Sequence, residues 1–406
     1  MSGGGPRWHP PAPADAPARA AALFTARYGV GPAGVWQAPG RVNLIGEHVD
    51  YAAGVCLPYA LPHRTRAAVR PRTDGRLRVA STELDPPWAG ELDAIGPGNP
   101  AGWPAYLAGA VWALRADGLL DGFGGADVLV DSDVPVGAGL SSSAALECAL
   151  AVALADLAGG GSGEPGSALR DRLARACVRA ENEVAGARTG GMDQAVALHA
   201  RAGHCLRLDT ADGTARPVPF DPAAHGLAVL VVNTNAPHRL VDGRYAARRA
   251  QVERAAALLG LPGLGVAGSV DEAVRRLAAL GERDAGLLRR VRHVITESAR
   301  ARAAAELLAA GRVAELGPLL TASHASLRDD YDLSCPELES AVGAATGAGA
   351  LGARLVGGGF GGSAIALLPA GTEPAVAAAV RARAARAGLP EPGFLLAPAA
   401  GAAGRA

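Results

Sequence analysis

The sequence predicts an α+β protein with two halves. Segments with helical and strand character mix along the 406 residues without the strict alternation that a doubly wound parallel sheet requires. A chain of this length can form two packed domains. The Gly-, Pro- and Asp-rich stretch 209–221 is the expected boundary, so we predict an N-terminal domain over residues 18–212 and a C-terminal domain over residues 213–406. Residues 1–17, rich in Gly, Pro and Ala, are expected to form a disordered arm.

The individual elements are predicted from apolar periodicity and from the turn residues that interrupt it. Helices are expected at 18–28, 103–116, 142–158, 169–187, 244–259 and 289–310. Short alternating or continuously apolar runs predict strands at 35–38, 64–70, 76–80, 126–130, 227–232 and 364–368. Turn signals such as Asp74-Gly75 separate neighbouring strands.

Composition and charge narrow the class of protein. Apolar residues make up 49% and charged residues 19% of the chain, as in a folded globular protein. The 39 basic and 39 acidic residues balance, which argues against nucleic acid or an anionic membrane as a partner. No apolar run approaches the roughly 20 residues that span a bilayer, and the N-terminus lacks a signal-peptide pattern. The five scattered cysteines argue against a disulfide framework or a zinc cluster, so we expect a cytoplasmic protein.

A Gly- and Ser-rich run between a predicted strand and a predicted helix is the most informative motif. It reads Val136-Gly-Ala-Gly-Leu-Ser-Ser-Ser-Ala-Ala145. Glycines allow the backbone to approach an anion, a helix start offers unpaired N–H groups, and serine hydroxyls can contact phosphate or Mg²⁺. The usual lysine-containing phosphate loop is excluded, because all 39 basic residues are Arg. The run predicts a phosphate-binding loop, and an ordinary strand–turn–helix capped by serines is the alternative.

A second polar segment, 39–51, sets Arg41, Glu47, His48 and Asp50 among apolar residues. Buried charged groups need partners or a ligand. This set can donate hydrogen bonds to, and accept them from, the many hydroxyl groups of a sugar. A metal site fits less well, because adjacent Glu47 and His48 diverge in a strand and the chain has no H-E-x-x-H motif. A solvated turn is the remaining alternative.

Two more segments are candidates for a functional site. In 189–194, a Gly-Gly turn presents Asp193 before an apolar run, where an Asp can also be a simple helix N-cap. Glu181 lies on the preceding predicted helix, where most glutamates face solvent. The glycine-rich run 357–363 is followed by a strand, whereas a dinucleotide-binding turn requires a helix there, so a tight turn is the simpler interpretation.

Together, these segments resemble the galactokinases of the GHMP family of small-molecule kinases. The matching pieces occur in the family's order from about residue 20 to about residue 370. They are 40–51, 137–145, 190–194 and 357–363, with further similarity at 233–245, 292–297 and 323–331. The resemblance implies two α+β domains with the active site in the cleft between them.

The resemblance also implies roles for individual residues. Asp193 matches the general base for the anomeric hydroxyl of the sugar, and Arg41 matches the arginine that stabilises the transferring phosphoryl group. Ser143 and Glu181 match Mg²⁺ ligands. The substrate-binding positions are Glu47, His48, Asp50, Gly190 and Tyr245, with Val49 between two of them. The residues that cradle the ATP phosphates are Gly137, Ala138, Gly139, Leu140, Ser141, Ser142 and Ser143.

The implied reaction transfers the γ-phosphoryl group of ATP to D-galactose, giving galactose 1-phosphate and ADP. ATP and Mg²⁺ are the expected cofactors, and we expect a monomer whose partners are small molecules. Galactokinases usually read E-H-T-D-Y-N, whereas Val49 and Ala52 replace the Thr and Asn here. A kinase for a related sugar, such as N-acetylgalactosamine, arabinose or galacturonic acid, is therefore an alternative. A non-catalytic galactose and ATP sensor is less favoured, because the segment Ser141-Ser-Ser-Ala-Ala145 is uninterrupted.

Overall fold

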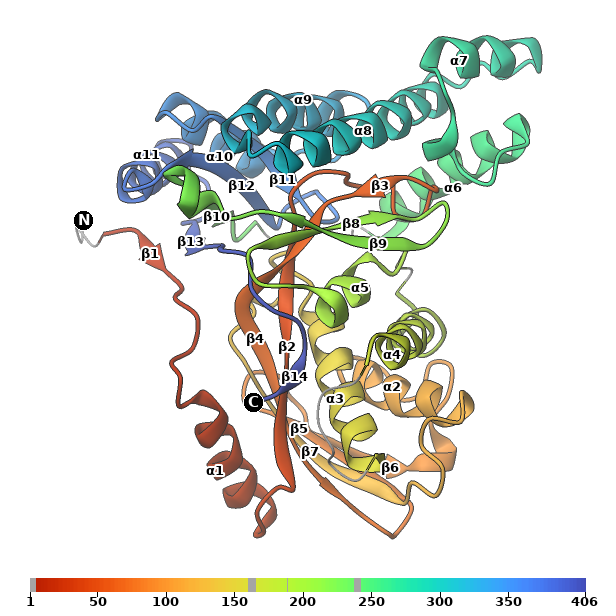
Figure 1. Ribbon diagram of the computed structural model, residues 1–406, viewed down its shortest axis with the longest axis vertical. Coiled ribbons are helices and arrows are strands. Elements are labelled where there is room, and N and C mark those ends of the chain that lie inside the picture. Colours follow the sequence, from red (N-terminus) through yellow and green to blue (C-terminus); the bar gives the residue numbers. More distant parts are fainter. Residues whose placement is uncertain (1–4, 160–165, 188, 237–241) are drawn as a thin grey trace.

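A six-stranded sheet organises the first half of the chain in the computed structural model, which describes residues 5–159, 166–187, 189–236 and 242–406 (Figure 1). The strand order is β14-β2-β4-β7-β5-β6, and the pairs are antiparallel except for the parallel pair β5–β7. The strands are β2 (Gly34–Asn43), β4 (Pro58–Pro71), β5 (Arg76–Ser81), β6 (Trp88–Glu91), β7 (Gly125–Ser132) and β14 (Gly404–Arg405).

Helices cover both faces of this sheet. On one face lie α2 (Pro104–Ala116), α3 (Ser142–Ala158), α4 (Ser167–Arg179), a π-helical turn η2 (Ala180–Ala185) and α5 (Met192–His199), while α1 (Ala16–Tyr28) packs on the other (Figure 1). The short 3-10 helix η1 (Leu92–Ala94) follows β6. Helix α3 is apolar nearly all round, which is the pattern of a helix at the centre of a core.

The second half is built on a five-stranded sheet of order β1-β13-β10-β12-β11, with several of its helices above it in Figure 1. Its strands are β1 (Arg7–Trp8), β10 (Leu227–Asn233), β11 (Gly352–Val356), β12 (Ser363–Pro369) and β13 (Gly393–Leu396). Its helices are α6 (Asp242–Leu259), α7 (Val270–Ala279), α8 (Ala285–Ala309), α9 (Leu316–Asp329), α10 (Pro336–Gly347) and α11 (Glu373–Arg386), with 3-10 turns η3 (Pro222–His225), η4 (Leu264–Val266) and η5 (Val313–Glu315).

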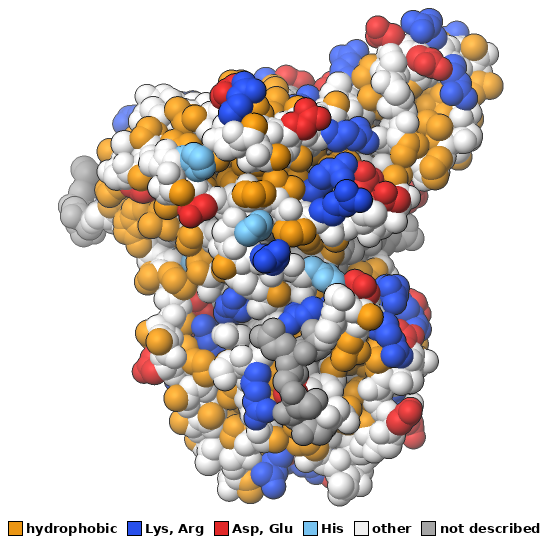
Figure 2. Space-filling view, viewed as in Figure 1, with side chains coloured by type: hydrophobic (Ala, Val, Ile, Leu, Met, Phe, Trp, Pro, Cys, Tyr) orange, Lys and Arg blue, Asp and Glu red, His pale blue; other side chains and the backbone are white. Residues whose placement is uncertain are grey.

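A small third sheet lies between the halves. It pairs β3 (Val55–Cys56), β8 (His204–Asp209) and β9 (Thr214–Pro219), and α8 packs against β3 and β9. In the space-filling view of Figure 2, which has the orientation of Figure 1, α6 and α7 project from the second half, and acidic and basic side chains are mixed over the visible face. In the described ranges, no helix has both the length and the apolar character needed to cross a membrane.

The structure corrects two expectations about the organisation of the chain. The predicted disordered arm over 1–17 is wrong for residues 5–17: β1 pairs with β13, the Ala12 N–H donates to the Asp133 carboxylate at 2.7 Å, and α1 begins at Ala16. Residues 1–4 lie outside the described residues. The boundary after residue 212 falls in the turn of the β8–β9 hairpin, so it separates two paired strands. We propose instead that the chain changes unit after β9.

Most predicted elements are confirmed, with shifted ends. The helix predicted at 142–158 has those bounds, and the predicted strand 35–38 is the centre of the longer β2. The predicted helix 169–187 is α4 followed by the π-helical turn. Helices α7, α9, α10 and α11 were not expected from the periodicity. In α10 and α11, many of the buried positions are Ala or Ser, which give a weak apolar stripe.

Candidate active site

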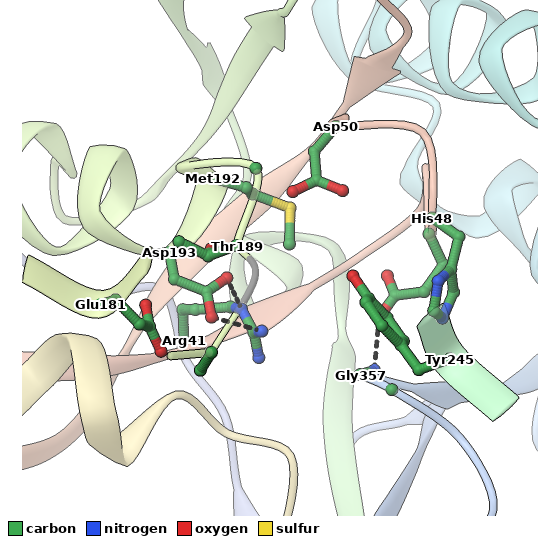
Figure 3. A pocket seen from close by; sticks show the side chains of 13 residues that line it. Arg41, His48, Asp50, Glu181, Thr189, Met192, Asp193, Tyr245 and Gly357 are labelled. Atoms are coloured by element: carbon green, nitrogen blue, oxygen red, sulfur yellow. Dashed lines mark hydrogen bonds and ion pairs between the residues drawn. The ribbon is translucent and has the colours of Figure 1, made fainter. Parts of the chain in front are cut away.

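A cavity of about 190 Å³ opens where the two halves meet, and it is shown in Figure 3. Its walls come from β2, the turn after β2, the η2–α5 segment, α6 and the loop after β11. The lining residues are Arg41, Glu47, His48, Asp50, Glu181, Ala187, Thr189, Gly190, Met192, Asp193, Tyr245, Gly357 and Gly358. Segments that are far apart in the sequence therefore contribute side chains to one polar space.

Arg41 and Asp193 form a bidentate ion pair at one side of this cavity (Figure 3). The Arg41 Nε and Nη2 atoms donate to the two Asp193 carboxylate oxygens at 2.7 and 2.8 Å, and Nη1 donates to the Gly139 carbonyl at 2.7 Å. The Ser141 hydroxyl also donates to Asp193. Asp193 is the second residue of α5, which follows Gly191 in a left-handed conformation. The fork fixes both side chains, and the carboxylate retains 18% exposure of its side chain.

The Gly- and Ser-rich loop runs behind this ion pair and leads into α3. Gly137 and Gly139 have φ angles of 73° and 72°, and Ser141 is also left-handed at 59°. The side chains of Ala138 and Leu140 are buried, so only backbone groups of these two residues can meet a ligand. Because α3 begins at Ser142, its first N–H groups and its positive dipole end lie at the loop. This geometry suits a phosphate group.

Glu181 reaches the same region from the π-helical turn. The Ser143 hydroxyl donates to Glu181 Oε1 at 3.0 Å, and Gln194 Nε2 donates to Glu181 Oε2 at 2.6 Å. Burial and the nearby Asp193 raise the pKa of Glu181 to about 7. Gln194 also donates to Glu147, a buried carboxyl whose pKa burial and Glu181 raise well above its ordinary value. Among the described residues, no cluster of three or more His, Cys, Asp or Glu side chains could hold a metal ion.

Glu47 is held at the opposite side of the cavity by groups from both halves. Arg354 on β11 forms an ion pair with Glu47 at 3.0 Å, and Arg354 Nη1 donates to the carbonyl oxygens of Asn43 and Leu44. The Asn43 amide and the Gly357 N–H also donate to the Glu47 carboxylate. The Glu47 carboxylate therefore lies at the cavity wall and is held there by these three groups.

His48, Asp50 and Tyr245 complete the wall that Figure 3 shows around the cavity. His48 has a left-handed backbone with φ 60°, which brings its ring to within 5.5 Å of the Tyr245 ring, centroid to centroid. Burial, followed by the charges of Asp193 and Glu47, raises the pKa of Asp50 to about 6. Gly190 lies against Asp50: a Cβ at this position would meet the Asp50 Oδ2 atom at 2.2 Å. Glycine is thus required for the close approach of these two segments.

Val49 is the one predicted substrate-binding residue that does not line the cavity. Its side chain is fully buried in the hydrophobic core, together with that of Ala52. The expectation that Val49 contacts the substrate is wrong for its side chain, because the turn that exposes His48 and Asp50 directs the residue between them inward. The other predicted substrate-binding residues line one cavity, and Ser143 and Glu181 are hydrogen-bonded to each other.

Several site residues were not anticipated from the sequence. Thr189 and Met192 line the cavity beside Asp193, and Arg354 anchors Glu47 from an otherwise apolar strand. A charged residue within the strongly apolar strand 352–356 was the signal for Arg354, because such a residue needs a buried partner. The glycine-rich run 357–363 was noted as a tight turn, and Gly357 and Gly358 line the cavity.

Comparisons with known proteins agree with this arrangement. A family model described as the galactokinase galactose-binding signature matches residues 22–71, the GHMP kinases N terminal domain matches 105–201, and the GHMP kinases C terminal domain matches 304–386. The galactokinase of Streptomyces coelicolor is 48% identical over 384 residues, covering 93% of this chain and 96% of the relative. That of Mycobacterium bovis is 44% identical over 358 residues, covering 87% and 94%.

Solved structures show the same likeness. The crystal structure of Lactococcus lactis galactokinase complexed with galactose matches with a TM-score of 0.87 and 29% identity, covering 95% of this chain and 98% of that one. Methanococcus jannaschii mevalonate kinase, with a TM-score of 0.59 and 17% identity, shares the fold. The family models and the extensive identity to curated relatives establish that this chain belongs to the galactokinase family of GHMP kinases.

Proposed function

We propose that this protein transfers the γ-phosphoryl group of ATP to the anomeric hydroxyl of D-galactose, giving galactose 1-phosphate and ADP. Membership of the kinase family implies ATP as co-substrate. The observation that carries the proposal is the bidentate Arg41–Asp193 pair, at the junction between the polar cavity and the loop that leads into α3. A phosphoryl acceptor in the cavity and a phosphate chain at the loop would meet there.

The chemistry follows from these positions. Phosphoryl transfer depends mainly on aligning the two reactants and neutralising charge on the transferring group. Asp193 would accept a hydrogen bond from the nucleophilic hydroxyl and take its proton as the bond to phosphorus forms. Arg41 holds Asp193 in place through the fork and supplies a permanent positive charge beside the reacting oxygens.

Ser143 and Glu181 fit a Mg²⁺ site that is completed by ATP. A hydroxyl and a carboxylate 3.0 Å apart are oxygen donors of the kind that Mg²⁺ prefers. Two protein ligands are too few to hold the ion alone, and Mg²⁺ normally relies on substrate phosphates and water for the rest. When bound, the ion would neutralise phosphate charge. The Ser143–Glu181 hydrogen bond holds these two oxygen ligands together at the start of α3.

A kinase for a related sugar is the second candidate. Val49 and Ala52 differ from the usual galactokinase residues, but both side chains are buried in the core and neither lines the cavity. Their effect on sugar choice would be indirect, which favours galactose. Initial rates of ADP release with galactose, N-acetylgalactosamine, arabinose and galacturonic acid decide between the candidates. Faster turnover of any sugar other than galactose would overturn the specific proposal.

Asp193→Ala separates an enzyme from a sensor. We predict that turnover falls by about three orders of magnitude or more, because both the proton acceptor and the partner of Arg41 are lost. Galactose binding, measured by calorimetry, should persist in weakened form. A variant with a tenth of the normal rate would show that Asp193 is not the base. Binding of galactose and ATP to the wild-type protein without ADP formation would favour the sensor.

The expected monomeric state and cytoplasmic location belong to this proposal as well. The cavity is lined by residues of one chain, so a single copy can supply a complete site. Light scattering at the assay concentration would test this directly, since a dimer mass would contradict the monomer.

A further inference from the structure

Two tyrosine hydroxyls form a chain that ends on the imidazole of His48. The His48 Nδ1 atom lies 3.0 Å from the Tyr51 hydroxyl, and the Tyr51 hydroxyl lies 2.9 Å from the Tyr331 hydroxyl. Tyr51 belongs to the turn after β2, whereas Tyr331 follows α9 in the second half of the chain. The Tyr331 ring packs 5.0 Å from the His48 ring, centroid to centroid. The chain therefore links a cavity residue to a part of the core outside the cavity.

The other ring nitrogen of His48, Nε2, is buried and makes no hydrogen bond of ordinary geometry to the described residues. The Gly357 backbone lies close enough to the ring to oppose the lowering of the His48 pKa, and His48 itself lines the cavity. A buried polar atom without a partner carries a free-energy cost that a ligand can remove. The position and the missing partner of Nε2 both point to a group that arrives with the substrate.

The imidazole carries a single proton. Burial lowers the pKa of His48 to about 3, against an opposing contribution from the Gly357 backbone. A neutral imidazole has one nitrogen that donates and one that accepts. Which nitrogen donates depends on the direction in which the two tyrosine hydroxyls point.

Among the hydrogen bonds of the described residues, one direction gives every hydroxyl proton of the chain an acceptor. If Nδ1–H and the Tyr331 hydroxyl both donated to the Tyr51 oxygen, the Tyr51 proton would have no acceptor there. Tyr331 is fully buried, and its hydroxyl contacts only the Tyr51 hydroxyl among the hydrogen bonds of the described residues. If His48 Nδ1–H donated to Tyr51, and Tyr51 to Tyr331, the Tyr331 proton would be buried without an acceptor. If Tyr331 donates to Tyr51, and Tyr51 donates to Nδ1, both tyrosine protons are used. The single imidazole proton then sits on Nε2.

We propose that Tyr51 and Tyr331 are positioning residues that fix His48 as an Nε2–H donor, and that this donor binds an oxygen of the sugar. The second part rests on the proposed function, whereas the tautomer itself does not. Glu47 and Asp50 supply hydrogen-bond acceptors at the same cavity. The carboxylates bind sugar hydroxyls that donate a hydrogen bond. The neutral Nε2–H group of His48 instead binds a sugar oxygen that accepts one.

The tautomer is measured first, without any sugar. Nitrogen NMR of histidine-labelled protein, with His48 assigned by its loss in His48→Gln, reports which ring nitrogen carries the proton. We expect the proton on Nε2 in the wild-type protein and a mixture of tautomers in Tyr51→Phe. Tyr331→Phe should also give a mixture of tautomers, because the buried hydroxyl proton that makes Tyr51 donate to Nδ1 is then missing. A proton on Nδ1 in the wild-type protein would overturn the proposal.

Sugar binding provides the second measurement. Tyr51→Phe should weaken the Kd for galactose roughly three- to tenfold, the usual effect of one hydrogen bond, and change kcat at saturating galactose much less. Tyr59→Phe is the matched control, because Tyr59 also has a buried hydroxyl, without a hydrogen-bond partner, and lies in the core away from the cavity. Equal Kd values for Tyr51→Phe and Tyr59→Phe would contradict the positioning role.

A double-mutant cycle and deoxygenated sugars locate the contact. In His48→Gln, the side-chain amide donates a hydrogen bond and has no tautomers. Adding Tyr51→Phe to this variant should therefore not change the Kd for galactose further. A set of deoxygalactoses, each lacking a different hydroxyl, then identifies the sugar oxygen that His48 binds. For the sugar that lacks this oxygen, Tyr51→Phe should no longer change the Kd. If no deoxygalactose cancels the effect of Tyr51→Phe, His48 does not donate to the sugar. If the wild-type protein binds no galactose, the proposed function fails, and the sugar-free spectra still decide the tautomer.

Discussion

The side chains that line the cavity carry more negative than positive charge. Glu47, Asp50, Glu181 and Asp193 line it, and Arg41 is the basic side chain among its described lining residues. Buried carboxylates raise one another's pKa unless each has a cationic partner. Asp193 has Arg41 and Glu47 has Arg354, whereas the pKa of Asp50 rises to about 6.

Asp50 is therefore expected to reduce the stability of the protein above its own pKa. Its folded-state pKa of about 6 exceeds the ordinary value of 3.8, so its ionisation costs stability as the pH rises through that range. We predict that Asp50→Asn raises Tm by a few degrees at pH 8, corresponding to at most about 3 kcal/mol, and that the gain vanishes near pH 4. Differential scanning calorimetry at both pH values tests this; an equal gain at both would contradict it.

The same substitution should weaken galactose binding at pH 8, because a neutral amide replaces a charged acceptor. The galactose affinity of the wild-type protein should itself fall as the pH decreases below about 6, and that of Asp50→Asn should change little over the same range. Calorimetric titrations from pH 5 to pH 8 would show the difference in slope. Stability and binding thus place opposite demands on this residue.

Arg41 supplies a second prediction for a single residue. Arg41→Lys keeps the charge but cannot form the fork to Asp193, so we expect kcat to fall by roughly two to three orders of magnitude. Arg19→Lys is a matched control, because Arg19 donates to both oxygens of Asp131 through the same kind of fork, away from the cavity. Steady-state rates for the two variants give the comparison. A similar loss in both would indicate a general effect of removing an arginine fork.

The residues of this site were predictable to different degrees. Arg41, Asp193 and the Gly- and Ser-rich loop stood out because polar or glycine-rich segments interrupted apolar runs. Val49 was misplaced, because a one-dimensional motif does not show which side of a turn each side chain takes. Arg354 was missed for a related reason: its partner Glu47 lies far away in the sequence, and the pairing exists only once β11 packs beside the turn after β2.

At the scale of single elements, the π-helical turn η2 determines where Glu181 points. A wide turn of this kind shifts the side chains that follow it relative to a regular α-helix, and such turns are frequent at functional sites. Here Glu181 is directed to Ser143 at the start of α3, while Glu183 on the same turn is exposed and pairs with Arg179. The sequence predicted one continuous helix over 169–187, since helical periodicity cannot reveal a single inserted residue.

This difference within one turn gives a matched pair of variants. Glu181→Gln keeps the shape of the side chain but removes the charge of the proposed metal ligand, so the Mg²⁺ concentration needed for half-maximal rate should rise at least about tenfold at fixed ATP. Glu183→Gln should leave it unchanged. Galactose affinity should be nearly unaffected in both variants. An unaltered Mg²⁺ requirement in Glu181→Gln would remove Glu181 from the metal site.

At the scale of the whole molecule, the last residues of the described chain join the two halves. After β13 in the second sheet, the Ala400 N–H donates to the Ala60 carbonyl at 2.8 Å and the Ala403 N–H to the Ala197 carbonyl at 2.7 Å. Strand β14 then pairs with β2 in the first sheet, beside the C label in Figure 1. The α+β class was predictable from the mixture of helical and strand patterns along the chain. The return of the last residues to the first sheet was not, because 397–406 has little apolar patterning.

Removal of residues 399–406 should therefore destabilise the first half. We predict a decrease of several degrees in Tm, because the buried Ala403 is removed from the core, Trp36 loses its contact with Arg405, and Arg64 loses its two carbonyl partners, Gly401 and Ala402. Arg405→Ala is the graded control: its ion pair to Asp156 spans 3.6 Å and the Arg405 side chain is half exposed, so its loss should cost little. Thermal unfolding that is indistinguishable between the truncated and full chains would refute the prediction.

The pairing of early strands with late strands also affects how the protein folds during its synthesis. Strand β1 near the start needs β13, and β2 needs β14 near the end, so each sheet contains strands from opposite ends of the chain. A nascent chain with only its first half synthesised lacks the edge partner of β2. Neither sheet can be completed before β13 and β14 have been synthesised, so both sheets close late in the folding of this chain. Until then, β2 lacks its edge partner at Trp36 and Gln37, and these backbone groups are open to pairing with neighbouring chains.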